Sequence, residues 1–179
     1  MHTVDAIHSR RSIRAYQARP VDRTVIGEIL WDAAQAPTLP PGLDTPFTFV
    51  VIEGADRLAL YGSQALDFAR ANGAEGPEGD TPVFFDAPVA IVICAEADAD
   101  GEALQNCTRA GQNLMLSAEA RGLGTCWVGL ALPWLHDSQT RAELAIPDGL
   151  TPFAAFTLGH PQGMPAGKPR ERPPVIWSP

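Results

Sequence analysis

Three arginines and a serine stand close together near the start of the chain, in the run Arg10-Arg11-Ser12-Ile13-Arg14. Guanidinium groups bind phosphate oxygens through paired, charge-assisted hydrogen bonds, and a serine hydroxyl adds a further donor. The run could therefore bind a phosphate group. An ordinary solvated basic turn accounts for the same pattern, and short arginine clusters are common, so the spacing alone leaves both interpretations open.

A second basic group stands near the other end of the chain, where Lys168, Arg170 and Arg172 alternate with proline and glutamate. The chain as a whole is acidic, with a formal net charge of -8 and an isoelectric point near 4.8. Its average field repels nucleic acid phosphates and anionic membranes, so we expect neither as a partner. An anionic ligand needs a local basic cluster. The two basic ends could form one anion pocket, or remain a charged turn and a charged tail.

Glycine recurs in the segment 122–129, which reads GLGTCWVG and joins a predicted helix to a predicted strand. Glycines let a backbone approach a flat ligand closely and leave the amide N–H groups accessible. A helix C-cap followed by a strand is the alternative interpretation. The segment does not match the GxGxxG fingerprint, which follows a strand rather than a helix, so a Rossmann-type dinucleotide site is not expected.

Histidine and cysteine form no pattern typical of a catalytic or metal site. The chain has no GxSxG or HExxH motif, and its three cysteines are far apart and have no histidine at a metal-ligand spacing. We therefore expect no metal site and assign no catalytic acid, base or nucleophile. The histidines, which we interpret as surface or capping residues, are His2, His8, His136 and His160.

The cysteines and the N-terminal sequence favour a cytoplasmic protein. Cys94 lies in an apolar run and Cys126 stands beside Trp127, so both suit small buried side chains in a reducing compartment. The first residues contain no apolar signal region, and no stretch approaches about eighteen consecutive apolar residues. We expect a soluble protein that is neither secreted nor inserted in a membrane.

The length of 179 residues and the hydrophobic content of 45% are sufficient for one domain with a substantial core. We predict a single α+β domain over 1–179, in which 159–179 is an extended, proline-rich arm. Apolar periodicity predicts helices at 22–35, 55–71, 103–121 and 134–144. Apolar and β-branched runs predict strands at 47–53, 88–94, 125–130 and 152–158.

Three of these elements have a defined place in the expected fold. The run 88–94 is almost unbrokenly apolar and 47–53 is rich in β-branched and aromatic residues, so both are predicted to be central strands. The helix 103–121 is predicted to be the central helix. Its apolar stripe consists of Leu104, Cys107, Gly111, Leu114 and Ala118.

Several short motifs occur along the chain in a characteristic order. They are SRRSIRAY at 9–16, Ala36-Pro37-Thr38, Pro46-Phe47 with Phe49-Val50-Val51, Phe85-Asp86-Ala87-Pro88-Val89, GQNLMLSA at 111–118, Gly122-Leu123-Gly124 with Trp127, and Leu158-Gly159-His160-Pro161. Together they cover nearly the whole chain. In their order, which is the specific part, the chain resembles the nitroreductase family.

The resemblance implies a mixed or antiparallel sheet flanked by helices, in subunits that pair as an intertwined homodimer. It also implies two FMN sites, each built at the interface from both chains. The implied cofactor-binding residues are Arg10, Arg11 and Ser12 at the phosphate, Arg14 at the pyrimidine edge, Thr38 in place of a family serine, Leu123 and Gly124 beside the reactive ring nitrogen, and Lys168 and Arg170 over the phosphate.

The activity that the resemblance implies is that of an FMN-dependent oxidoreductase, which takes electrons from NADH or NADPH and passes them to a small organic acceptor. In the implied ping-pong mechanism, the nicotinamide leaves before the acceptor occupies the same face of the flavin. The cofactor carries the redox chemistry, so the protein supplies stacking, phosphate binding and flavin electronics. Nitroaromatics, quinones, activated alkenes and free flavin are candidate acceptors.

The loop 38–45 departs from the family pattern. Relatives offer a Ser, an Asn and a Gln to the flavin there, whereas this chain reads TLPPGLDT. Thr38 can replace the serine, but an ionised Asp44 accepts hydrogen bonds only and cannot mimic an amide donor. Three hypotheses follow: a nitroreductase with an altered site, an enzyme like the flavin destructases or reductive dehalogenases, and a degenerate fold without FMN that serves as a ligand-binding or structural dimer.

Overall fold

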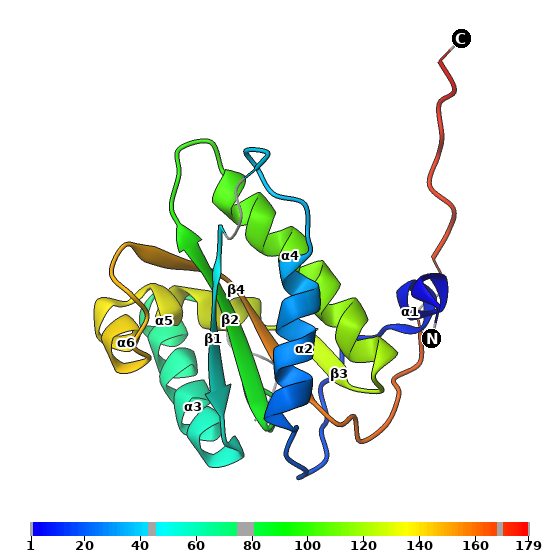
Figure 1. Ribbon diagram of the computed structural model, residues 1–179. Coiled ribbons are helices and arrows are strands. Elements are labelled where there is room, and N and C mark those ends of the chain that lie inside the picture. Colours follow the sequence, from blue (N-terminus) through cyan, green and yellow to red (C-terminus); the bar gives the residue numbers. More distant parts are fainter. Residues whose placement is uncertain (1, 43–45, 75–80, 168–169, 179) are drawn as a thin grey trace.

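A four-stranded antiparallel sheet forms the centre of the protein in the computed structural model, which describes residues 2–42, 46–74, 81–167 and 170–178. Its strands lie in the order β1-β2-β4-β3 (Figure 1). Their bounds are β1 Thr48–Glu53, β2 Val89–Glu96, β3 Gly124–Trp127 and β4 Leu150–Gly159. The antiparallel sheet and the helices that flank it confirm the predicted α+β class.

The prediction of two central strands is right for β2 and wrong for β1. β2 pairs with β1 on one side and with β4 on the other, and all of its residues except the last are buried. Within the described part of the chain, β1 pairs with β2 alone, and Val51 keeps 36% of its surface exposed. β-branched and aromatic residues suit a half-buried edge strand as well as a central one, so composition could not separate the two cases.

Helices cover both faces of the sheet (Figure 1). Their bounds are α1 Thr3–Ser9, α2 Arg23–Ala34, α3 Ala55–Ala71, α4 Glu102–Ala120, α5 Leu132–His136 and α6 Ser138–Glu143. α2, α3 and α4 begin and end within one residue of the predicted bounds. In α2 the physical reason is visible, because the Asp22 carboxylate caps the helix by accepting a hydrogen bond from the Thr24 amide at 2.7 Å. No helix among the described residues is long and apolar enough to cross a membrane.

Two hydrophobic cores lie on opposite faces of the sheet. α2 and α4 pack against the face that carries Ile91 and Phe156. α3 and α5 pack against the other face, which carries Val92 and Ala155. Neighbouring residues of one strand therefore enter different cores, as the twofold alternation of side chains along a strand requires.

The buried stripe of α4 differs from the predicted stripe at its first residue. Cys107, Gly111, Leu114 and Ala118 are buried, as predicted. Leu104 is 48% exposed, so the prediction for this residue is wrong. Ala103 is buried in its place, because the buried face of the helix extends to the side that also carries Asn106 and Ala110. Gly111 lies on the Phe156 ring so closely that an added Cβ would overlap the ring.

The segment 125–144 contains more breaks than its apolar pattern indicates. β3 ends at Trp127, and a short 3-10 helix at Gly129–Ala131 follows, so the predicted strand is too long. The predicted helix 134–144 is divided at Asp137, whose carboxylate caps α6 by accepting hydrogen bonds from the amides of Gln139 and Thr140 at 3.0 and 3.1 Å. Apolar periodicity does not register such a cap, because the capping side chain is polar.

The C-terminal segment leaves the body of the protein after β4. A bridge pairs Pro161 with Tyr16, and beyond Gln162 the described residues form no helix or strand. The segment then projects away past α1 (Figure 1). Ile176 and Trp177 near its end are 94% and 87% exposed. The apolar end of this segment has no cover from the described residues of its own chain. The extended arm over 159–179 stays a prediction.

Candidate functional site

The N-terminal segment that carries the arginine run is fixed against β3. The Ile13 amide donates to the Thr125 carbonyl oxygen at 2.9 Å, and Ser12 forms a bridge with Thr125. Ile13 is 1% exposed and fills the space beside Gly124, where an added Cβ would lie 2.5 Å from its Cγ1 atom. The arginines around Ile13 are therefore presented from a rigid backbone.

Arg10 contains a buried nitrogen that lacks a hydrogen-bond partner. Its Nη1 atom is shielded from solvent, and no described residue accepts a hydrogen bond from it. A buried donor without a partner costs about 1–3 kcal/mol, more when it is charged. An anion placed here would remove this cost. The arrangement fits the phosphate group that the sequence analysis assigns to Arg10.

Arg11 has a different environment from Arg10. Its Nη1 atom donates to the carbonyl oxygens of His8, Ser9 and Arg10 at 2.8, 2.9 and 3.0 Å, at the C-terminal end of α1. Gly167 of the C-terminal arm passes so close to this guanidinium that a Cβ there would overlap it. The structure thus gives Arg11 a helix-capping role that the sequence pattern did not indicate.

Ser12 and Arg14 lie around the buried thiol of Cys126. Burial raises the pKa of this thiol, while the charges of Arg14 and Arg10 and hydrogen bonds with Arg14 and Ser12 partly oppose the increase. The Arg14 guanidinium also lies 5.8 Å from the centre of the Phe85 ring, in a cation–π arrangement. Both Ser12 and Arg14 border a surface pocket of about 430 Å³. The structure therefore brings Arg10, Ser12 and Arg14 together around β3, and we call these three residues the arginine cluster.

The glycine-rich segment serves the fold more directly than the sequence analysis indicates. Gly122 has a φ of 73° and ends α4, and the Leu123 amide donates to the Ala118 carbonyl oxygen at 2.9 Å. The Leu123 side chain is buried in the core, and Gly124 is in contact with Ile13. The helix-cap interpretation of Gly122 is therefore confirmed. The flavin contacts of Leu123 and Gly124 stay a prediction.

Thr38 lies at the opposite end of α4 from the arginine cluster. The next residue, Leu39, is hydrogen-bonded to Asn106 in the first half of α4, whereas β3 follows the last residue of that helix. Asn106 and the end of α4 are about 20 Å apart, at a rise of 1.5 Å per residue. Within one chain, Thr38 and the arginine cluster therefore do not meet. Arg170 is exposed on the projecting arm, and Lys168, Asp44 and Thr45 lie outside the described residues.

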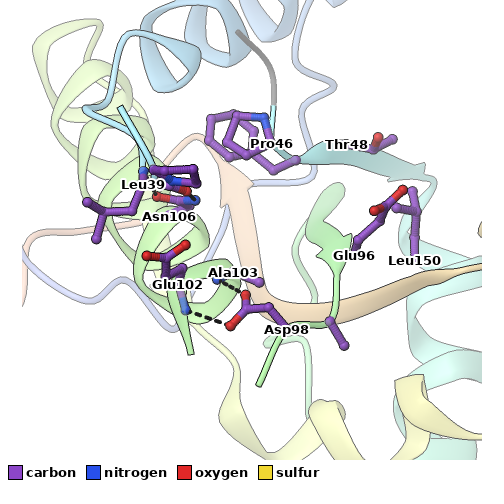
Figure 2. Close-up of a pocket in the computed structure, with 12 residues that line it drawn as sticks. Leu39, Pro46, Thr48, Glu96, Asp98, Glu102, Ala103, Asn106 and Leu150 are labelled. Carbon is purple, nitrogen blue, oxygen red and sulfur yellow. Dashed lines mark hydrogen bonds between the residues drawn. The ribbon is translucent and has the colours of Figure 1, made fainter. Parts of the chain in front are cut away.

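The end of α4 that contacts Leu39, next to Thr38, is called the Thr38 end. A pocket of about 530 Å³ opens beside it (Figure 2). Leu39 and Asn106 line one side, Phe47 and Leu150 are apolar wall residues, and Glu96 is also at the pocket. Neither the pocket nor Asn106 was indicated by the family motifs. The one available signal was the position of Asn106, since a polar amide on the buried stripe of α4 needs hydrogen-bond partners.

The described residues offer no cluster of three or more His, Cys, Asp or Glu side chains that could hold a metal ion. Burial raises the pKa of the Cys94 thiol to about 11 and that of the Cys107 thiol to about 12. These thiols are protonated at neutral pH and are not activated nucleophiles. Cys94 and Cys107 therefore act as core residues, as the sequence analysis expects of Cys94.

Comparison with known sequences gives an extended match. The sequence profile of the Nitroreductase family matches residues 7–160. A protein of Methanothermobacter thermautotrophicus, whose name assigns it as an NADH dehydrogenase/NAD(P)H nitroreductase, is 32% identical over 92% of this chain and 80% of its own length. A protein of Rhodospirillum rubrum named 5,6-dimethylbenzimidazole synthase is 30% identical over 86% of this chain and 79% of its own length.

Solved structures match the fold over the whole chain. A nitroreductase from Bacteroides fragilis with bound FMN has a TM-score of 0.84 at 20% identity, covering 99% of both chains. A nitroreductase from Desulfitobacterium hafniense with bound FMN has a TM-score of 0.79 at 22% identity, again covering 99% of both. At these identities the likeness concerns the fold, which agrees with the fold that the sequence motifs imply.

Proposed function

This chain belongs to the nitroreductase family, and we propose that it is an FMN-dependent oxidoreductase that passes electrons from NADH or NADPH to a small organic acceptor. Nitroaromatics, quinones and activated alkenes are the acceptor classes that we propose. The sequence match to the relative from M. thermautotrophicus supports the nicotinamide donor, because its name includes NAD(P)H nitroreductase. The order of events that we propose is ping-pong, with nicotinamide and acceptor using one binding face in turn.

The observation that carries the proposal is the unpaired, buried Nη1 atom of Arg10. It lies in the segment that the family motif assigns to the FMN phosphate, beside Ser12 and Arg14. A buried guanidinium N–H without a partner is unfavourable, and an anion would supply the missing acceptor. The chain is acidic overall, with a net charge of -8, so this local cluster is what would hold an anionic cofactor.

The residues of this chain would bind and orient the cofactor. FMN, when bound, supplies the hydride chemistry between nicotinamide and acceptor. Arg10 and Ser12 would hold its phosphate, and Arg14, which lies over the Phe85 ring, would place a positive charge at the pyrimidine edge. We assign no protein acid, base or nucleophile to the reaction, since the cofactor carries the redox step.

A homodimer would bring the two halves of this site together. Thr38 and the arginine cluster lie at opposite ends of α4, and the helix from Asn106, which contacts Leu39, to its last residue is about 20 Å long at 1.5 Å per residue. If a second chain packs antiparallel to the first, the Thr38 end of each chain meets the arginine cluster of the other. A twofold axis then creates two equivalent sites, as is usual for isologous dimers. The exposed apolar residues Ile176 and Trp177 on the arm support the same assembly, because a partner surface would bury them.

The visible absorption spectrum tests the cofactor. Purified protein is mixed with FMN, desalted to remove unbound flavin, and compared with protein that received none. We expect flavin bands at about one FMN per chain, and a molecular mass in solution near twice 19.1 kDa. Protein that retains no flavin at any concentration contradicts the proposal and favours the degenerate, FMN-free dimer. A monomer contradicts the shared site.

A second candidate reaction comes from the relative in R. rubrum, which is named 5,6-dimethylbenzimidazole synthase. An enzyme of this type would consume the flavin rather than return it, in line with the destructase hypothesis of the sequence analysis. Incubation with FMN, NADH and oxygen, with and without a nitroaromatic or quinone acceptor, followed by chromatography, separates the two. Recovery of intact FMN together with acceptor-dependent NADH oxidation supports the oxidoreductase, and loss of FMN with formation of dimethylbenzimidazole supports the second candidate.

A further inference from the structure

Asn106 is a polar side chain in a position that the core otherwise fills with apolar residues. It lies on α4 one position before Cys107, and only 2% of its surface is exposed. A buried amide is costly unless both its donor and its acceptor find partners. The buried Asn106 amide is therefore expected to form hydrogen bonds with the residues that it contacts.

Both partners of Asn106 belong to one residue of the loop. The Asn106 Oδ1 atom accepts a hydrogen bond from the Leu39 amide at 2.8 Å, and its Nδ2 group donates to the Leu39 carbonyl oxygen at 2.8 Å. The Asn106 side chain lies against the Leu39 backbone beside the pocket (Figure 2). Two opposed hydrogen bonds fix both the position and the direction of the backbone at Leu39, directly after Thr38.

The helix that carries Asn106 is itself well anchored at this end. The Asp98 carboxylate accepts hydrogen bonds from the amides of Glu102 and Ala103 in the first turn of α4 (Figure 2). These bonds also hold the pKa of Asp98 below its usual range, so the cap is charged at neutral pH. The loop is thus tied to a rigid element. Asn106 supplies this tie from the helix, in a chain whose loop contains neither of the family's amide residues.

We infer that Asn106 is a positioning residue, which holds the Thr38–Leu39 backbone in the shape that the flavin site requires. The inference rests on the proposed function, because the loop serves the flavin only if FMN binds. The loop 38–45 lacks the Asn and Gln that the family offers to the flavin. In this chain a side-chain amide stands on α4 instead, and Asn106 acts through the backbone of Leu39. The altered loop is then compatible with tight FMN binding.

The test compares the wild-type protein with three variants. Asn106→Ala removes both hydrogen bonds, and Asn106→Asp keeps the acceptor but donates only when its carboxyl is protonated. Asn113→Ala is the matched control, because Asn113 is an asparagine of the same helix that contacts α2 through a longer hydrogen bond, of 3.4 Å, to the Asp32 carbonyl oxygen. Circular dichroism confirms that each variant is folded.

Two measurements are made on each protein. Hydrogen exchange, followed by mass spectrometry on FMN-free protein, reports the protection of the Leu39 amide. Quenching of FMN fluorescence reports the dissociation constant. For Asn106→Ala we expect faster exchange in the peptide that contains Leu39 and a dissociation constant raised about tenfold, because two hydrogen bonds are lost. For Asn113→Ala we expect neither change.

The Asn106→Asp variant adds a signature that a general loss of packing would not produce. A protonated carboxyl offers one donor and one acceptor, as the amide does, whereas a carboxylate repels the Leu39 carbonyl oxygen. The FMN affinity of this variant, taken relative to wild type at each pH, should therefore rise as pH falls. A ratio that is independent of pH contradicts the inference.

The outcomes separate the inference from the function on which it rests. Faster exchange together with weaker FMN binding supports it. Unchanged exchange in Asn106→Ala overturns the tie to Leu39, and faster exchange with unchanged FMN affinity overturns its role in the flavin site. If wild-type protein binds no FMN, the proposed function fails and the flavin role falls with it, while the exchange data still decide whether Asn106 holds the loop.

Discussion

The two ends of α4 present opposite hydrogen-bonding situations. Beside its C-terminal end, the buried Nη1 atom of Arg10 has no partner among the described residues. Near its N-terminal end, both the oxygen and the nitrogen of the buried Asn106 amide are hydrogen-bonded to Leu39. The first end lacks a partner among the described residues and could take one from a bound anion, whereas the second finds its partner within the chain. A ligand should therefore contribute most of its binding energy at the arginine cluster, and the Thr38 end should contribute by being held in shape.

Among the replacements considered, Arg10→Ala should change the affinity for FMN most. Loss of a buried charge that pairs with the phosphate is expected to weaken FMN binding about 100-fold, or about 2.7 kcal/mol. Fluorescence titration with FMN measures the change. Arg23→Ala is the control, because Arg23 forms an exposed ion pair with Glu53 away from the arginine cluster. Equal affinities for wild type and Arg10→Ala would remove the contrast between the two ends.

The replacement Gly124→Ala tests whether the arginine cluster depends on the docking of its segment. The new methyl group would lie 2.5 Å from Ile13 Cγ1, so either β3 or the N-terminal segment must move. We expect a loss of about 2 kcal/mol in the free energy of unfolding, as for other overpacked sites. Urea denaturation measures it. Gly27→Ala in α2, where a Cβ meets nothing within 4 Å, should instead stabilise by about 0.5–1 kcal/mol.

The replacement Arg11→Ala separates two neighbouring arginines that the sequence motif treats alike. Arg11 caps α1, so its loss should lower the free energy of unfolding by about 1 kcal/mol. Its effect on FMN affinity should stay below about threefold, since its Nη1 atom is already engaged. Thermal denaturation and FMN titration give the two values. An effect on affinity as large as that of Arg10→Ala would return Arg11 to the phosphate site that the motif assigns to it.

The replacement Asp32→Asn examines the contact between α2 and the last turn of α4 and should have the smallest effect. Hydrogen bonds from Ser117 and Arg121 lower the pKa of Asp32 below its usual value, so its charged form is favoured in the folded protein. The resulting stability is present above the unfolded-state pKa of about 3.9 and is lost as pH falls through the lowered, folded-state pKa.

The side chain of Asp32 is 42% exposed, so solvent screening limits its contribution to below about 1 kcal/mol at pH 7. Urea denaturation at several pH values should show wild type and Asp32→Asn converging below about pH 4. FMN affinity should not change. A weaker affinity in this variant would show that the packing of α2 against the last turn of α4 also acts on the flavin site.

The elements that the sequence predicts well are those whose signals are local. α3 begins and ends at the predicted residues, and β2 is evident from its unbroken apolar run. α1 went unpredicted, because only Ala6 among its seven residues is buried and no apolar stripe marks it. The break at Asp137 went unpredicted for a related reason, since a polar cap interrupts the helix while the apolar spacing continues.

The site residues also differ in whether a local sequence signal identifies them. The motif identifies Arg10, Ser12 and Arg14, and the structure places them together. The motif could not separate Arg10 from Arg11, because the distinction depends on where α1 ends and which carbonyl groups it leaves open. The hydrogen bonds of Asn106 could not be predicted for a spatial reason, since its partner Leu39 is 67 positions away in the sequence.

The contact between Gly111 and Phe156 has a consequence for the geometry of the proposed dimer. The helix rests on the ring with no room for a methyl group, so close packing fixes its height above the sheet. If FMN binds as proposed, one site would lie near each end of α4. The spacing of the two sites would then be set by the helical backbone and not by mobile side chains.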